Sequence, residues 1–202
     1  MNSKLTEAEI YDKFADIVAA SLRVEREKVT MDAHLMDELG AESLDLIEIT
    51  METESAFDVW LPEKSILDTA AEVFGPDILV HEGLLTEAGK QLLRSRMPPE
   101  NAHLFEGEVT VKTLQSSFLT VRSWVALIER LRQYTPVTCE ACGGALKAET
   151  GFHMQCAVCH QRVALQSGED LNRQWVQQYY DREYLPSKVA DAQGEPMSAT
   201  SV

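Results

Sequence analysis

Four cysteines near the end of the chain constrain its fold more tightly than any other feature. They are the only cysteines among 202 residues, they fall within 21 positions, and they form two C-x-x-C pairs separated by thirteen residues: Cys139, Cys142, Cys156 and Cys159. Each pair supplies two thiolates, and a short hairpin between the pairs brings four sulfurs to one tetrahedral cation. Gly143 and Gly144 provide the conformational freedom that the first tight turn needs. We therefore predict a zinc ribbon over residues 136–166, with Zn²⁺ in a structural role.

The charge of the chain is concentrated in its first half. The formal net charge is −15, and residues 1–110 hold 24 acids against 9 bases, whereas residues 111–202 hold 9 of each. A field of this sign repels phosphate backbones and anionic membrane surfaces, which argues against nucleic-acid or membrane-surface binding through that half. The sequence has no apolar run of the roughly 18 residues that a membrane span needs, and its N-terminal residues do not resemble a secretory signal. We expect a cytoplasmic protein.

The cytoplasmic expectation bears on the state of the cysteines. Thiols stay reduced in that compartment, which favours a metal site over the alternative of two disulfides. Iron is the alternative metal, because four thiolates suit either ion. His153 and His160 lie nearby, but four thiolates already complete a tetrahedral site, so we expect neither to be a ligand. Residues 136–166 hold two bases and two acids, which favours docking to protein over binding to nucleic acid.

Apolar residues recur at helical spacing in the first half. Thr6 precedes two acids and is typical of a helix cap, and a helix is expected to run from there to about residue 22. Residues 23–39 carry sparse apolar anchors and predict a long loop laid over a core. A second helix is expected over 43–57. The residues expected to face inward from it are Leu44, Ile47, Met51, Ala56 and Phe57.

The remainder of the chain is predicted to consist of shorter segments. Further helices are expected over residues 65–73, 87–97, 118–134 and 168–182, with Gly-Pro and Pro-Pro breaks between some of them. The last stretch, 186–202, is small and polar, and we expect it to be disordered. The predicted fold is mainly α, with a small ribbon. The predicted boundaries are a helical domain over 1–135 with an insertion at 65–110, the ribbon over 136–166, a helix within 167–185 and the tail over 186–202.

The segment that leads into the second expected helix carries a motif. A glycine turn places a serine at the helix start, in the order Leu39-Gly40-Ala41-Glu42-Ser43-Leu44. Taken alone, such a serine reads as a helix cap. With Phe57 and Pro62 at the far end of the helix, however, the segment resembles the acyl carrier proteins, the phosphopantetheine-attachment family, whose signature is L-G-x-D-S-L followed by an acidic helix. Residues 29–35 also resemble the loop that precedes that signature.

The resemblance has implications for function. It implies a carrier-type helical bundle with 4′-phosphopantetheine attached to Ser43 as a phosphodiester, and acyl or aminoacyl groups carried as thioesters in fatty-acid, polyketide or related biosynthesis. A helix N-terminus suits this attachment, because its free N–H groups and dipole favour an anion. A carrier of this kind is not an enzyme; it raises the effective concentration of a tethered substrate. The alternative is a non-catalytic protein-interaction adaptor with a carrier-like fold and a structural zinc ion.

Two features depart from the pattern of the family. Glu42 stands where the family usually has Asp, which keeps the charge and moves it outward by one methylene. More than fifty residues separate Pro62 from the expected last helix, so residues 65–110 are predicted to be an insertion. Its apolar side chains are most simply explained as core, although a longer acyl-binding cavity or a partner surface would use the same residues.

The acids around Ser43 suggest a docking surface. Residues 29–63 contain ten acids and no base, which is more than a merely solvated helix face requires. The resemblance implies that basic patches on partner enzymes read this surface, since opposite potentials speed encounter and set orientation. The expected partners are a phosphopantetheinyl transferase and acyl-activating, condensing or acyl-transferring enzymes. The candidate docking residues are Asp37, Glu38, Glu42, Asp45, Glu48 and Glu52.

Overall fold

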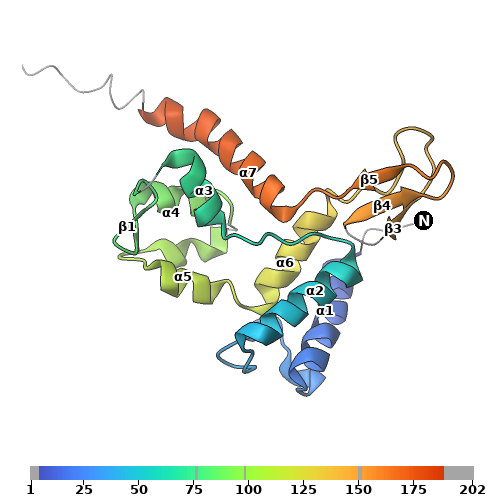
Figure 1. Cartoon of the computed structure of the whole chain (residues 1–202). Coiled ribbons are helices and arrows are strands. Elements are labelled where there is room, and N and C mark those ends of the chain that lie inside the picture. The colour runs from blue at the N-terminus through green and yellow to red at the C-terminus, as the bar shows by residue number, and fades with distance from the viewer. Residues whose placement is uncertain (1–4, 76, 98, 150–151, 189–202) are drawn as a thin grey trace, which may run out of the picture. The chain divides into compact units, whose positions relative to one another are not determined.

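The structure of the chain is a computed structural model that describes residues 5–75, 77–97, 99–149 and 152–188. The chain is mainly helical, as predicted, and it divides into two compact units (Figure 1). We call Met1–Glu63 together with Lys112–Gly168 the first unit, and Lys64–Val111 together with Glu169–Val202 the second unit. Both units are therefore built from segments that are distant in the sequence.

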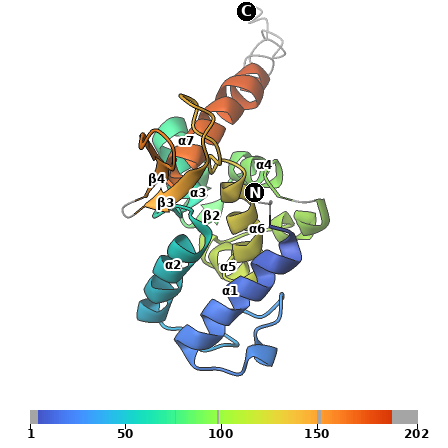
Figure 2. The same cartoon turned by 90° about the vertical axis from the view of Figure 1, so that its right-hand side faces the viewer.

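The helical part of the first unit is a small bundle. Its elements are α1 (Glu7–Leu22), the 3₁₀ turn η1 (Arg26–Lys28), α2 (Ser43–Phe57) and α6 (Val121–Arg132), which α5 (Val111–Ser117) precedes. Helix α1 packs against both α2 and α6 (Figures 1 and 2). Burial of apolar side chains between these elements stabilises the bundle. Its buried residues include Ile10, Phe14, Val18, Val29, Leu35, Ile49, Phe57, Val121, Val125 and Ile128.

The start of α1 has the predicted cap. The Oγ1 atom of Thr6 accepts the backbone N–H of Glu9 at 3.3 Å, and the Glu9 carboxylate accepts the N–H of Thr6 at 2.8 Å. This reciprocal capping box satisfies two N–H groups that the helix itself leaves unpaired. Helix α1 ends where Arg23 turns into the left-handed region, with φ of 55°. The cap and the end of this helix confirm the prediction from the sequence.

Helix α2 has the predicted bounds, and Phe57 is buried as predicted, but the prediction that Leu44, Ile47 and Met51 face inward was wrong. The buried positions are Ile49, Thr53 and Phe57. The side chains of Leu44, Ile47 and Met51 are 78%, 56% and 64% exposed. Both sets repeat at three- to four-residue steps, so the spacing predicts a helix without showing which stripe the rest of the bundle covers.

The helix predicted over residues 118–134 begins later than expected. Thr120 caps α6, because its Oγ1 accepts the backbone N–H of Ser123 at 3.3 Å. Leu119, the residue before the cap, is not part of the helix. Its carbonyl accepts the N–H of Leu35, in the long loop, at 2.8 Å. This backbone pairing joins the start of α6 to the loop that leads into α2.

The ribbon is a three-stranded antiparallel sheet within the first unit. Its strands are β3 (Leu146–Glu149), β4 (His153–Cys156) and β5 (Arg162–Ala164), in the order β3-β4-β5. Leu146 lies opposite Cys156, and Met154 lies opposite Val163. The small sheet predicted to accompany the four cysteines is thus confirmed.

The second unit combines Lys64–Val111 with the helix that follows the ribbon. It contains α3 (Ile66–Phe74), the hairpin β1 (Val80–His81) and β2 (Leu84–Leu85), α4 (Glu87–Arg94) and η2 (Pro99–Phe105). Helix α7 (Gly168–Tyr179), continued by a π-helical turn (Tyr180–Tyr184), completes the unit. The predicted helix over 168–182 is present. The tail was expected to be disordered over 186–202, but residues 186–188 are helical; residues 189–202 lie outside the described residues.

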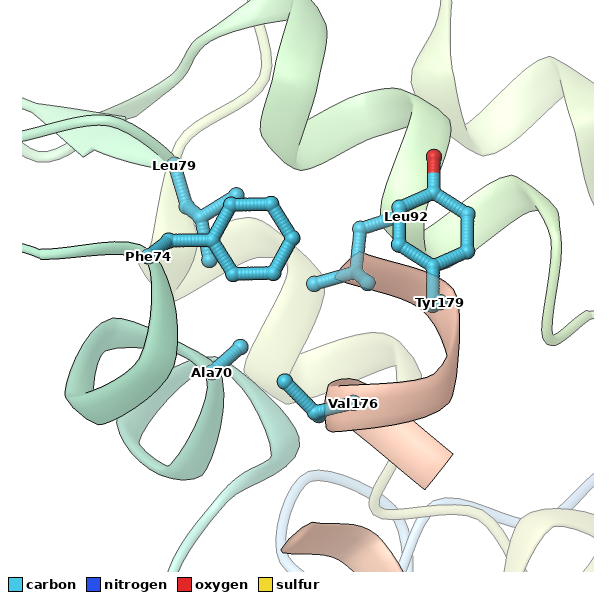
Figure 3. Close-up of a cluster of buried hydrophobic side chains, with 6 residues drawn as sticks. All are labelled: Ala70, Phe74, Leu79, Leu92, Val176 and Tyr179. Carbon is cyan, nitrogen blue, oxygen red and sulfur yellow. The ribbon is translucent and has the colours of Figure 1, made fainter. Parts of the chain in front are cut away.

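The second unit has a hydrophobic core of its own. Figure 3 shows side chains from α3, α4 and α7 pointing toward one another. The cluster consists of Ala70, Phe74, Leu79, Leu92, Val176 and Tyr179. Apolar residues within 65–110 therefore serve as core, which was the explanation that the sequence favoured. Their packing partner is α7, more than sixty residues further along the chain, and the sequence pattern did not predict that pairing.

Among the described helices, none is both long enough and apolar enough to cross a membrane.

Candidate functional site

The four cysteines converge on one point. Their Sγ atoms all lie within 4.8 Å of one another. The closest pairs are Cys142 with Cys156 at 3.4 Å and Cys139 with Cys159 at 3.6 Å. A disulfide requires about 2.05 Å, so these are free thiols. Four Zn–S bonds of about 2.3 Å in a tetrahedron place the sulfurs about 3.8 Å apart, so the arrangement fits a tetrahedral metal ion.

Two glycines shape the first turn of the cluster. Gly143 has φ of 70°, a region that side chains disfavour, and its N–H donates to the Cys139 carbonyl at 2.8 Å. A Cβ atom on Gly144 would lie 2.9 Å from the Sγ of Cys156, closer than such contacts allow. The second turn is closed by the His160 N–H, which donates to the Cys156 carbonyl at 3.1 Å. The backbone hydrogen bonds of these two turns are thus consistent with the close approach of the two cysteine pairs.

The thiols of the cluster have divergent proton affinities. The backbone N–H groups of Cys159 and Val158 donate to the sulfur of Cys156 and lower the pKa of that thiol to about 6. For Cys159, a backbone hydrogen bond with Gln161 lowers the pKa, but the neighbouring thiols and burial outweigh it and raise the pKa to about 12. Crowded sulfurs resist a second negative charge, and a divalent cation removes that penalty. The donor set therefore fits Zn²⁺.

The cluster sits on the hydrophobic core of the ribbon. Cys139 and Cys156 are buried in it, and Cys142 and Cys159 lie exposed at its surface. The set of metal-capable groups contains the four cysteines and neither His153 nor His160. The core residues are Cys139, Leu146, Met154, Cys156 and Leu165, with Phe152 and Val163 packed against them.

Ser43 occupies the first position of α2, and it does not cap the helix. The N-cap is Glu42, whose carboxylate pairs with the N–H of Asp45, while the Asp45 carboxylate accepts the N–H of Glu42 at 2.8 Å. The reading of Ser43 as a simple cap was therefore wrong. Its side chain is exposed, and among the described residues its hydroxyl has no hydrogen-bond partner. The hydroxyl is thus available for modification next to the unpaired N–H groups of a helix start.

The loop before Ser43 is held by backbone bonds. The N–H of Ala41 donates to the Leu35 carbonyl at 2.8 Å, and Gly40 supplies the turn with φ of 76°. His34 is 12% exposed, and its Nδ1 accepts the N–H of Asp37 at 3.0 Å, which is a role in loop structure. These contacts fix where α2 begins and thereby position Ser43.

The candidate docking acids lie on α2 and on the loop that leads into it, and α2 also exposes apolar residues. Asp37, Glu38, Glu42, Glu48 and Glu52 are exposed, and Asp45 is half-buried by its capping role. The apolar stripe of Leu44, Ile47 and Met51 lies on the exposed side of the same helix. The sequence analysis did not predict that this stripe is exposed. The sequence does contain a signal for this exposure: α2 carries two stripes at helical spacing, and a helix with one buried face can bury only one of them.

Comparisons with known proteins follow the same segment. Residues 12–73 match the family model described as the phosphopantetheine attachment site. An acyl carrier protein of Chlorobium phaeovibrioides is 42% identical over 60 residues, which cover 30% of this chain and 77% of that protein. The acyl carrier protein of Chlorobium luteolum gives the same values, and that of Syntrophobacter fumaroxidans is 41% identical over 64 residues, covering 31% and 79%. The family-model match ends at residue 73, so it includes the first residues of the predicted insertion over 65–110 and does not reach the helix expected over 118–134.

Proposed function

Because this chain belongs to the acyl carrier protein family, defined by the phosphopantetheine attachment site, we propose that it carries acyl or aminoacyl groups on a 4′-phosphopantetheine arm attached to Ser43. When bound, the arm supplies a thiol that holds its cargo as a thioester. The protein then serves fatty-acid, polyketide or related biosynthesis in the cytoplasm, and it performs no catalysis itself.

The observation that carries this proposal is the state of the Ser43 hydroxyl. It is exposed at the first position of α2, and Glu42 has taken over the capping role that would otherwise occupy it. A phosphodiester at this hydroxyl lies against the N–H groups of the first turn and the positive end of the helix dipole. Glu42 and Asp45 form the reciprocal cap of α2, and we assign them a second role beside Ser43 in recognition of partner enzymes.

The outer side of α2 provides the proposed recognition surface. A stripe of exposed apolar side chains runs between exposed acids, and such a mixture suits a partner with a hydrophobic centre and a rim of Arg and Lys. The proposed partners are the phosphopantetheinyl transferase and the acyl-activating, condensing or acyl-transferring enzymes of the pathway.

The four-cysteine cluster is proposed to hold one Zn²⁺ in a structural role. All four ligand positions are filled by the thiols of Cys139, Cys142, Cys156 and Cys159, which leaves no open position for a reacting water or substrate. Metal binding contributes directly to the folding free energy of a segment with so small a core.

The arm and its cargo are tested together by the intact mass of the protein isolated from its native cell. We expect a species about 340 Da heavier than the bare chain, accompanied by still heavier acylated species. Neutral hydroxylamine cleaves thioesters, so it should convert the acylated species to the 340 Da form and release the cargo for identification. Protein that carries no added mass under conditions of active biosynthesis would favour the adaptor function.

The docking surface is tested by charge reversal on α2. We expect Glu48→Lys with Glu52→Lys to lower kcat/KM for the transferase by about tenfold at low salt, because like charges on the partner slow encounter. The difference should shrink as the salt concentration rises. The matched control is Glu106→Lys with Glu108→Lys, which changes the net charge equally on exposed acids of the second unit. An equal loss in this control would show that net charge alone matters and that α2 is not the docking surface.

A further inference from the structure

Phe152 joins the ribbon core to the segment that follows α2. It lies between β3 and β4, packs against the core that contains Cys139 and Cys156, and its carbonyl accepts the N–H of Leu165 at 2.9 Å. Its ring stacks on the indole of Trp60, with ring centroids 4.5 Å apart and planes 8° from parallel. One aromatic side chain thus contacts both the core around the cysteine cluster and the segment that follows α2.

The backbone of Phe152 is held in a conformation that a bulky residue avoids. Its φ is 58°, in the left-handed region that glycine and asparagine normally occupy. Such a conformation persists only where surrounding contacts hold it. The contacts available here are the ribbon core on one side and Trp60 on the other.

The segment around Trp60 also contacts Gly168, which follows the ribbon in the sequence. The N–H of Gly168 donates to the Trp60 carbonyl at 2.7 Å, and a Cβ atom at position 168 would lie 2.6 Å from the Cδ of Pro62. On the bundle side, the Leu61 N–H donates to the Glu54 carboxylate at 2.9 Å. Residues 59–62 are therefore held by α2, by Phe152 in the turn between β3 and β4, and by Gly168 after the ribbon.

We propose that the four-cysteine ribbon acts as an internal brace for the docking helix: metal bound by the cysteines keeps Phe152 stacked on Trp60 and thereby holds the C-terminal end of α2. The ribbon is then a positioning element of the carrier rather than an independent docking module. The metal-dependent part of the brace rests on the proposed zinc site. The physical basis is that the small ribbon core needs the metal to stay folded, and Phe152 leaves its strained position when that core loosens.

Hydrogen exchange of the full-length chain, resolved at residues 59–61, tests the brace. In the zinc-loaded protein these amides are expected to be protected. Removing zinc with a chelator should speed their exchange about tenfold or more, while the amides of α1 change little. Phe152→Ala should speed exchange at 59–61 in the same way while retaining about one zinc ion per chain.

Controls separate the brace from simple unfolding and from the zinc proposal. Lys147→Ala removes an exposed side chain of β3 that takes no part in the cysteine cluster, and it is expected to leave both zinc and exchange at 59–61 unchanged. If Phe152→Ala loses zinc, Phe152→Leu keeps an apolar group at the core and removes only the ring stacking. Zinc content is measured in every sample. Zinc-loaded protein whose exchange at 59–61 is indifferent to chelation and to both Phe152 variants overturns the brace. A wild-type chain that binds no zinc overturns the metal site, and the Phe152 variants then decide the stacking alone.

Discussion

Replacing Ser43 by alanine is expected to abolish phosphopantetheinylation completely. Apo protein incubated with coenzyme A and a phosphopantetheinyl transferase of broad specificity should gain about 340 Da, and Ser43→Ala should gain nothing. The reason is chemical: the attachment needs a hydroxyl nucleophile, and this one is exposed at the helix start with no competing hydrogen bond among the described residues. Intact-mass spectrometry measures the change directly.

The matched control for this experiment is Ser55→Ala. Ser55 is exposed on the same helix, three turns from Ser43, and its hydroxyl has no proposed role. This variant should be modified at the wild-type rate. Peptide mapping of the modified wild-type protein should place the added mass on the peptide that contains Ser43. Modification of Ser43→Ala, or failure of several transferases to modify the wild-type chain, would contradict the proposed attachment.

Replacing Cys156 by serine is expected to remove the bound zinc and to unfold the ribbon. Structural zinc sites contribute on the order of 10–16 kcal/mol of binding free energy at neutral pH, and a ribbon with so few core residues has little else to hold it. Elemental analysis should find about one zinc ion per wild-type chain and none in the variant. His160→Ala, an exposed neighbour outside the sulfur cluster, is expected to retain zinc. Equal zinc content in Cys156→Ser and wild type would refute the site, and iron in place of zinc would correct its metal.

The same site should respond to pH in a definite direction. The pKa of Cys156 in the folded chain is lowered from 9.0 to about 6, so its thiolate stabilises the metal-free fold. That contribution is full above about pH 9 and is lost as the pH falls through about 6. Protons and zinc compete for the same sulfurs, so zinc affinity must fall with pH as well. A zinc titration between pH 5 and 8 measures this slope.

The chemistry-bearing residues could be predicted because each depends on short spacing. The two C-x-x-C pairs determine a four-sulfur cluster almost regardless of the rest of the chain, since each pair lies within one turn. The L-G-A-E-S-L segment likewise places Ser43 at a helix start, and both ends of α2 were predicted correctly. What the local pattern did not reveal was the cap: Glu42 and Ser43 are both plausible capping residues, and their competition is decided by the geometry of the entering loop.

Local sequence patterns did not predict the packing of the second unit. The apolar spacing of α3, α4 and α7 predicted three helices, but not that α7 packs into one core with α3 and α4, which lie more than seventy residues earlier in the chain. The hairpin of β1 and β2 was also missed, because strands of two residues carry no periodicity. The glycine at position 83 was the signal for this turn in the sequence; in the structure Glu82 and Gly83 have φ of 48° and 79°.

By itself, the sequence determined the mainly helical class, the position of the family motif, the four-sulfur cluster and the acidic character of the first half. These features depend on residues a few positions apart or on composition, so the spacing of residues and a count of charges are enough to predict them. The tertiary structure alone decided that Leu44, Ile47 and Met51 face outward, that Phe152 stacks on Trp60, and that α3 and α4 pack with α7. Each of these outcomes depends on which apolar surfaces pack together although they are far apart in the sequence. The hydrophobic effect is non-directional, so the local pattern does not specify the packing partner.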